Sequence, residues 1–219
     1  ARIKPTIDNG GQAIVNDEEG FNNLHEEHQN QWLNRVDPRS IESIHSYLCW
    51  GEYDYSFFSK INRLKEKMII SGNCRRDLLE AYGRNFYSAD IESLRSIYGD
   101  YLLFIDNFCV ECWRQDYQPP VFAVSKEKNM EAYREYYNSI KEQSEAREYF
   151  AKYVHSVAKA FPTKQIIIRP HPVADPRWWH SNFWSYRNVH VIFHHSIEPW
   201  IHACSALISM GCTTAIQAV

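Results

Sequence analysis

The segment IIIRPHPVAD, residues 166–175, decides the fold class. Its three isoleucines, Ile166 to Ile168, predict a strand that is apolar on both faces, as in a parallel sheet covered by helices. The strand continues into Arg169, and His171 then stands between two prolines that restrict the backbone and stiffen it. Because Arg169 and His171 are two residues apart on an extended segment, we expect them to point the same way.

Other apolar stretches extend this pattern along the chain. Further strands are predicted at residues 67–71, 101–108, 189–193 and 206–211. Helical periodicity predicts helices over 53–67, 75–83, 126–161 and 197–205, whereas 84–100 is mixed and 175–187 is a Trp-rich loop. From residue 100 onward strands alternate with helices, which indicates an α/β domain with a parallel sheet.

Composition narrows the class of protein. The net charge of −3 gives no basic excess, so no nucleic-acid partner is expected. The sequence contains no apolar run of the roughly 18 residues that a membrane span needs. The six cysteines are scattered, which fits a reducing cytoplasm. The first residue is not Met and TTAIQAV reads as an opening helical turn, so we expect an internal piece of a longer protein.

Polar residues gather where the predicted strands end, which is where ligands bind in open parallel sheets. We expect five such clusters to share one cleft. They are Gly72, Asn73 and Arg75; Asp106 and Asn107; Arg169 and His171; His194, His195 and Ser196; and Gly211, Cys212, Thr213 and Thr214.

Two of these clusters suit an anion. The Arg169 guanidinium is a planar fork of donors that matches phosphate, and His171 can donate to the same group. Gly211 allows close backbone approach, the next helix begins with unpaired amides, and Thr213 and Thr214 add hydroxyls. Each cluster alone could be a capped strand or a helix cap. Together they favour a phosphate or diphosphate site.

Carboxylates supply candidate acids and bases. Asp17, Glu18 and Glu19 are adjacent, and like-charged neighbours raise a carboxyl pKa toward the range useful for general acid or base catalysis. A solvated loop is the alternative for these three. Asp106 is a second candidate, with turn formation as its alternative. Neither the CxxC of Cys109 nor the His pair has a matching second ligand set, so no metal and no cofactor are expected.

An ordered set of motifs resembles a known family. The segments NDEEG, WGEYD, ISGNCRRDLL, LLFIDNF, IIRPHP and IEPWIHACSALISMGCTTAIQA resemble the bacterial surface carbohydrate (surface polysaccharide) biosynthesis protein family. The RPHP step is also similar to the His-Pro motif of GT-B glycosyltransferases that use CMP-activated sugars, and to that of teichoic-acid glycerophosphotransferases. The resemblance implies a GT-B-like fold of two Rossmann-like units with parallel sheets, both truncated. Residues 1–98 would form the acceptor side and a linker, and 99–219 the nucleotide-binding side.

The resemblance also implies residue roles. His171 and the hydroxyls of Thr213 and Thr214 would contact the nucleotide phosphate, and an acid of the Asp17–Glu19 cluster would act as catalytic acid or base. Gln217 stands where the family has a Glu that binds the ribose, and Cys74 replaces a proline.

The function implied is a metal-independent glycosyltransferase of surface polysaccharide biosynthesis. It would transfer a sugar from a nucleotide-activated donor, with a CMP-sugar favoured, to a glycan or lipid-linked acceptor. It would work in the cytoplasm or at the inner membrane. A glycerophosphotransferase, a nucleotide-sugar epimerase and a non-catalytic carbohydrate-assembly protein remain alternatives.

Overall fold

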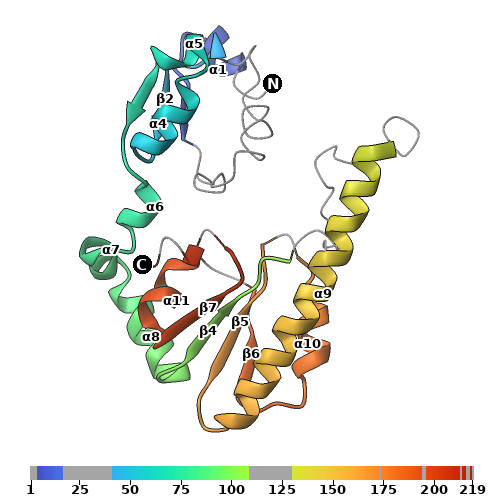
Figure 1. Ribbon diagram of the computed structural model, residues 1–219. Helices are drawn as coiled ribbons and strands as arrows, with labels where there is room; N and C mark the ends of the chain where they lie inside the picture. The colour runs from blue at the N-terminus through green and yellow to red at the C-terminus, as the bar shows by residue number, and fades with distance from the viewer. Residues whose placement is uncertain are drawn as a thin grey trace. The chain divides into compact units, whose positions relative to one another are not determined.

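The chain folds into two compact units, Ala1–Glu80 and Ala81–Val219, each built on its own parallel sheet (Figure 1). The structure is a computed structural model, and it describes residues 4–16, 41–108, 130–172, 174–193, 196–212, 214–215 and 218. Two parallel sheets confirm the predicted α/β class. The division after Glu80 lies earlier than the expected division at 98/99, because the helices that follow Glu80 pack within the second unit.

The first unit carries a three-stranded sheet in the order β1-β2-β3. Its elements are α1 (Lys4–Asp8), β1 (Ile14–Asn16), β2 (Ser46–Cys49), α4 (Glu52–Phe58), α5 (Asn62–Lys65), β3 (Met68–Ile70) and α6 (Cys74–Asp77). Its core joins Tyr47 and Cys49 of β2 to Phe57, Phe58 and Leu64 of the following helices. Of the three strands, β3 was predicted and β1 was not, because β1 lies in a polar stretch and is only partly buried.

The helix predicted over 53–67 is interrupted. It forms as α4 and α5, with Ile61 extended between them. Ser56 and Ser59 donate through their hydroxyls to the carbonyls three residues earlier, at 2.8 Å each. Such local side-chain bonds compete with helix continuation, and the apolar period alone does not reveal them.

The second unit carries a four-stranded parallel sheet in the order β6-β5-β4-β7. The strands are β4 (Leu102–Ile105), β5 (Ile166–Arg169), β6 (Val189–Val191) and β7 (Ala206–Ser209). All four were predicted. The isoleucines of β5 have no exposed surface, as expected for a strand covered on both faces.

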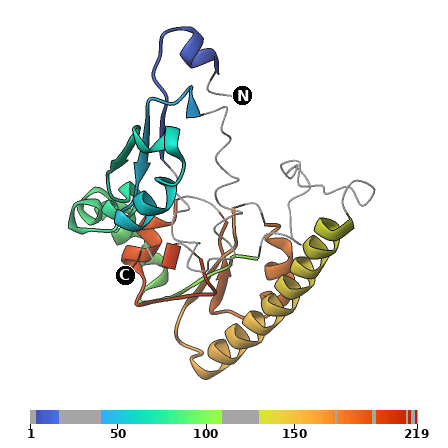
Figure 2. The ribbon, with the colours of Figure 1, turned by 45° about the horizontal axis from the view of Figure 1, so that its top comes forward.

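Helices cover both faces of this sheet. The helices of the unit are α7 (Ala81–Phe86), α8 (Ser88–Tyr98), α9 (Met130–Ala160), α10 (Arg177–Phe183) and α11 (Glu198–Ala203). Helices α9 and α10 lie on one face, over Ile166 and Ile168, in both views (Figure 1, Figure 2). Helices α8 and α11 pack together on the other face, over Ile167. The sheet is therefore the middle layer of three.

Two helices of this unit were not predicted. Helix α8 lies in the stretch interpreted as mixed; it buries only Ile91 fully and ends at Gly99, where φ is +64°. Helix α10 lies in the Trp-rich stretch interpreted as a loop. Its Trp179 and Phe183 rings stack one helical turn apart, and Trp179 is buried against Phe150 of α9. Tertiary packing of aromatic rings, rather than an amphipathic pattern, stabilises α10.

Within the described residues no helix is long and apolar enough to cross a lipid bilayer.

A buried amide joins α9 to the sheet. The Nδ2 atom of Asn188 lies 3.2–3.3 Å from the carbonyl oxygens of Ala158, Phe161 and Lys164, at the end of α9 and in the turn before β5. The backbone carbonyl of Asn188 accepts a hydrogen bond from Ile166 at 2.8 Å. One side chain therefore donates both to the end of α9 and to the turn before β5, where helix carbonyls lack intrahelical donors.

Replacing Asn188 by Ala should lower the free energy of unfolding by about 2–3 kcal/mol, because buried carbonyls lose their donor. Urea unfolding followed by circular dichroism measures this. Asn182→Ala is the matched control, since Asn182 is half-buried and donates to a single carbonyl. An equal loss in the two variants would contradict the proposed clamp.

Candidate nucleotide site

Three strands of the second unit end side by side. Arg169 at the end of β5 and Ser209 at the end of β7 both pair with Ile105 of β4, one on each side. We call this the carboxyl edge. Strands β5 and β7 are separated by β4, so the two predicted anion-binding clusters are about 10 Å apart in strand spacing rather than on adjacent strands.

Arg169 is held beneath this edge. Its side chain is buried, and its guanidinium carbon lies 5.2 Å from the centroid of the Trp200 ring in α11. Burial lowers the pKa of Arg169 to about 10, and the nearby Tyr101 and Glu198 partly offset that effect. The guanidinium stays charged at neutral pH, lies over an aromatic face and is favoured electrostatically by the buried Glu198 carboxylate. The positive charge thus lies inside the edge rather than free in solvent.

His171 lies two residues beyond the end of β5 and is half-buried. Its carbonyl accepts a hydrogen bond from the amide of Ala174 at 2.8 Å, which closes a turn. The turn and the flanking prolines fix the backbone that carries the imidazole. His171 is therefore more open to a ligand than Arg169.

The loop after β7 is organised by internal hydrogen bonds. Gly211 has φ +71°, a conformation that glycine adopts without strain. The amide of Cys212 donates to the hydroxyl of Ser209 at 3.3 Å, and the Cys212 thiol donates to the Thr214 hydroxyl at 3.3 Å. Cys212 and Thr214 are buried, whereas Gly211 is exposed. Of these three predicted ligands, Gly211 alone is open to solvent.

Asp106 follows β4 and is buried, with 1% of its surface exposed. Its carboxylate accepts hydrogen bonds from the amide of Phe108 at 2.5 Å and from the indole Nε1 of Trp179 at 2.6 Å. Burial raises its pKa to about 6, although these bonds and the charge of Arg147 oppose the change. Both oxygens are engaged, so in this structure Asp106 attaches α10 to the sheet. Its neighbour Asn107 is half-buried.

The remaining predicted residues divide between the units. Ser196 is exposed and lines a cavity with α8 and α11. In the first unit, Gly72 has φ +80° and Asn73 caps α6, accepting from the amides of Arg75 at 3.0 Å and Arg76 at 3.4 Å. These residues follow β3, as the sequence indicated. A cleft shared by all clusters stays a prediction.

Several predicted residues lie outside the described part of the chain. They are Asp17, Glu18, Glu19, Thr213, Gln217, His194, His195, Cys109 and Cys112. Within the described ranges no group of three His, Cys, Asp or Glu side chains is arranged to hold a metal ion.

Sequence reasoning missed the residues that support the edge. In α11, the Trp200 ring contacts Arg169 and the Glu198 carboxylate compensates its charge. In α10, the Trp179 indole donates a hydrogen bond to Asp106. Arg147 of α9 stacks 4.1 Å from the Trp178 ring centroid. The high Trp content was the available signal, but tryptophans line clefts and cores alike.

Comparisons with known proteins identify the fold. Neither a family model nor a curated protein sequence matches the chain. UDP-GlcNAc 2-epimerase from Neisseria meningitidis, solved with UDP-GlcNAc bound, is similar with a TM-score of 0.53 and 11% identity, over 94% of this chain and 50% of that one. The chain thus spans half the length of this structure.

Two more solved structures are more distant. A variant of the wall teichoic acid polymerase TagF has a TM-score of 0.47 and 12% identity, over 91% of this chain and 42% of that one. HepE from Anabaena, in complex with UDP-glucose, has a TM-score of 0.42 and 10% identity, over 94% of this chain and 48% of that one. The likeness to the epimerase and the two parallel sheets establish a GT-B-like fold.

The raised pKa of Asp106 makes a prediction about stability. The carboxyl binds its proton more tightly when folded, so Asp106 contributes stability below about pH 4 that is lost as the pH rises through about 6. A displacement of about two pH units corresponds to about 3 kcal/mol. Asp106→Asn should remove this dependence, measured by urea unfolding at several pH values.

The control for this experiment is Glu148→Gln, which changes an exposed carboxylate of α9. It should keep the pH dependence of the wild type. An Asp106→Asn variant whose stability falls with pH as steeply as that of the wild type would show that Asp106 does not titrate in this range.

Proposed function

We propose that this chain forms part of a GT-B-like glycosyltransferase of bacterial surface polysaccharide biosynthesis. It would transfer a sugar from a nucleotide-activated donor, with a CMP-sugar favoured, to a glycan or lipid-linked acceptor. The donor is a substrate, and no cofactor is needed. The reaction would take place in the cytoplasm or at the inner membrane. The GT-B-like fold and the resemblance of the motif set support this assignment.

One observation carries the proposal: Arg169 and the Ser209–Gly211 turn lie at the same level on either side of β4. A diphosphate or phosphate with its attached ribose is long enough to bridge such a separation. Ligands of open parallel sheets bind at this edge, where loops and helix N-termini offer donors.

The described contacts suggest a division of roles. Arg169, Cys212 and Thr214 are buried and would support the site from below. His171 and the Gly211 backbone, with Thr213 beyond the described ranges, would contact the phosphate directly.

Catalysis would come mainly from electrostatic stabilisation of the leaving phosphate by these groups, which would replace a metal ion. Arg169 contributes a fixed positive charge at short range, and His171 a hydrogen bond whose strength grows as negative charge develops on the leaving oxygen. A carboxylate of the Asp17–Glu19 cluster would exchange a proton with the acceptor hydroxyl or act at the sugar. In this scheme Asp106 would position α10, and its catalytic role remains the weaker alternative because both oxygens are occupied.

Nucleotide binding tests the proposal directly. CMP at a hundredfold excess over its Kd should raise the melting temperature of the chain by about 5 °C in a thermal-shift assay. His171→Ala should weaken that binding about tenfold to a hundredfold, because a charge-assisted hydrogen bond is lost. His180→Ala, an exposed histidine of α10, is the matched control and should bind as the wild type does.

Other outcomes select the alternatives. Stabilisation by CDP but not CMP would favour glycerophosphate transfer, and stabilisation by UDP alone would favour an epimerase. No stabilisation by any of the three nucleotides would favour the non-catalytic carbohydrate-assembly protein. Equal effects of the two His variants would remove His171 from the site.

The catalytic carboxylates are tested separately. In the full-length protein, Glu18→Gln and Glu19→Gln should lower kcat at least about a hundredfold, because a general acid or base is lost. Nucleotide binding should be unchanged. Release of nucleotide from the donor that stabilises the protein measures turnover, and Glu148→Gln is the control. Unchanged turnover in both variants would exclude this cluster from the mechanism.

A further inference from the structure

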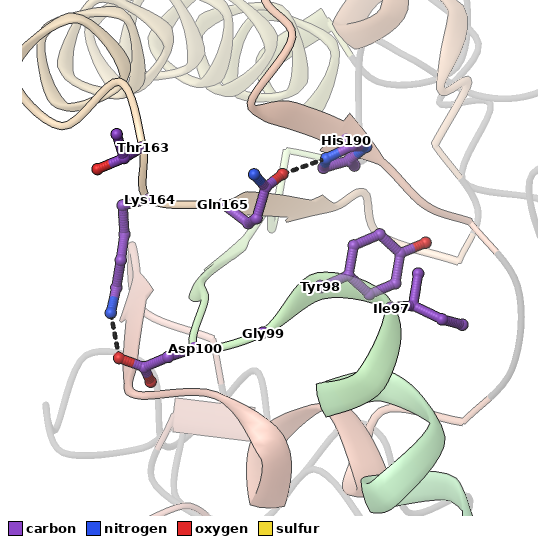
Figure 3. A pocket seen from close by; sticks show the side chains of 8 residues that line it. All are labelled: Ile97, Tyr98, Gly99, Asp100, Thr163, Lys164, Gln165 and His190. Carbon is purple, nitrogen blue, oxygen red and sulfur yellow. Dashed lines mark hydrogen bonds and ion pairs between the residues drawn. The ribbon is translucent and has the colours of Figure 1, made fainter.

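A cavity of about 570 Å³ lies at the opposite edge of the second sheet from Arg169 (Figure 3). We call this the amino edge, because its walls come from the turns that precede β4 and β5. Asp100 comes from the turn after α8, and Lys164 and Gln165 from the turn after α9. His190 of edge strand β6 and Tyr98 at the end of α8 complete it. No residue of this cavity belongs to the proposed nucleotide site.

The cavity is polar but carries little net charge. The Lys164 ammonium forms an ion pair with the Asp100 carboxylate, and this bond lowers the pKa of Asp100. Burial lowers the pKa of His190 from its ordinary value, so the ring is neutral at neutral pH. The one ammonium and the one carboxylate of the lining therefore compensate each other. Such a lining gives no advantage to a phosphate or a carboxylate ligand.

Two side chains are set to exchange hydrogen bonds with hydroxyl groups. The Nε2 atom of His190 lies 2.6 Å from the Oε1 atom of Gln165. Because an amide oxygen can only accept, Nε2 carries the proton and the Nδ1 atom of the neutral ring is an acceptor. The Gln165 amide nitrogen is turned away from His190 (Figure 3) and offers two donors. The pair thus presents donors and an acceptor in fixed orientation.

The Tyr98 ring is a rigid apolar surface beside these groups. It meets the His190 ring at 5.2 Å between centroids and packs on Tyr101 at 6.2 Å and Trp200 at 5.7 Å. An aromatic ring held on several sides keeps its position when a ligand binds, which lowers the entropic cost of association. Figure 3 shows the ring on the same side as His190 among the residues that line the cavity.

A second cavity, of about 330 Å³, lies next to the first along α8. Ile97 and Tyr98 line both cavities, and the second is further lined by Asp90, Ser93 and Ser196. Ser196 follows β6, so the second cavity extends from the Tyr98 ring toward the other end of the sheet. Two neighbouring cavities offer room for a ligand of several linked rings.

We propose that these neighbouring cavities bind an uncharged oligosaccharide, with Tyr98 as the platform for a sugar ring and with Gln165 and His190 as hydrogen-bond partners. Sugar rings present hydroxyls that donate and accept, together with C–H faces that pack on aromatic rings. They carry no charge that would compete for the Asp100–Lys164 pair. Identification of the ligand as the growing polysaccharide rests on the proposed function, whereas saccharide binding itself does not.

The test uses the 219-residue chain with maltotriose, cellotriose and chitotriose as probes. Saturation-transfer NMR should show binding of at least one of the three, and titration calorimetry gives its Kd. Gln165→Ala should weaken binding about tenfold, because hydroxyl partners are lost. Tyr98→Leu should weaken it at least as much. Tyr153→Leu changes a half-exposed tyrosine of α9 on the other face of the sheet and should have no effect.

Several outcomes would overturn the proposal. The first is that none of the three trisaccharides binds, and the second is that neither Gln165→Ala nor Tyr98→Leu weakens the binding. The third is that inorganic phosphate binds at the same residues more strongly than the trisaccharides, which shifts of the Lys164 resonances would detect. Thermal unfolding establishes that each variant is folded. Tyr98→Phe keeps the ring and its packing, so it should retain most of the affinity. This variant tests the role of the ring if Tyr98→Leu is unstable.

The two sites can fail independently. His171→Ala should leave saccharide binding unchanged, and Gln165→Ala should leave nucleotide stabilisation unchanged. Loss of both kinds of binding in either variant would show a general structural defect rather than two sites.

Discussion

The alignment of β5, β4 and β7 is the constraint on which the second unit depends. The side chains of β5 alternate between two apolar clusters, with Ile166 and Ile168 under α9 and Ile167 under α8 and α11. A slip by one residue would turn every side chain to the other face, so Arg169 would enter the cluster under α9. The register with Ile105 therefore keeps the guanidinium against the Trp200 ring.

The residues at the carboxyl edge are of two kinds: buried groups that support the loops, and groups that face solvent. Buried Arg169 and Asp106 contact tryptophans of neighbouring helices, and buried Cys212 and Thr214 are hydrogen-bonded to each other. Burying these groups is costly unless their partners are in place. Arg169 therefore ties the end of β5 to α11, and Asp106 ties the end of β4 to α10. His171 and Gly211 are then presented on backbone whose course is already set. Such preorganisation is what electrostatic stabilisation of a phosphate requires.

The amino edge differs in its chemistry. Its charges compensate each other, its imidazole is neutral, and an aromatic ring takes the place of a guanidinium. One parallel sheet thus carries an edge with a buried guanidinium and an edge whose ion pair is compensated and whose surface is aromatic. Helix α8 lines both cavities, because Ile97 and Tyr98 at its end belong to each. A saccharide bound along α8 and a donor bound at the carboxyl edge would both be held by the second unit.

An element could be predicted from the sequence where the residues that stabilise it lie close together in the chain. The strands of the second unit were evident from short β-branched or apolar runs such as Ile166–Ile168, since burial on both faces leaves a purely local signature. Helix α10 was not evident, because Trp179 and Phe183 are held by rings of α9 that are distant in sequence. Helix α8 was not predicted, because it buries only one residue fully and so its apolar pattern is weak. The cavity at the amino edge had no motif at all, since its lining residues lie in three separate segments, 97–100, 163–165 and 190.

The amino-acid sequence alone determined the α/β class, the strands of the second sheet and the placement of Arg169, His171 and Gly211 at strand ends, because these follow from local polarity and backbone preference. The tertiary structure decided that β4 separates β5 from β7, that Asp106 and Arg169 are buried supports, and that Tyr98, Gln165 and His190 meet. Strand order and burial depend on contacts between residues far apart in the chain, and local sequence patterns do not encode them.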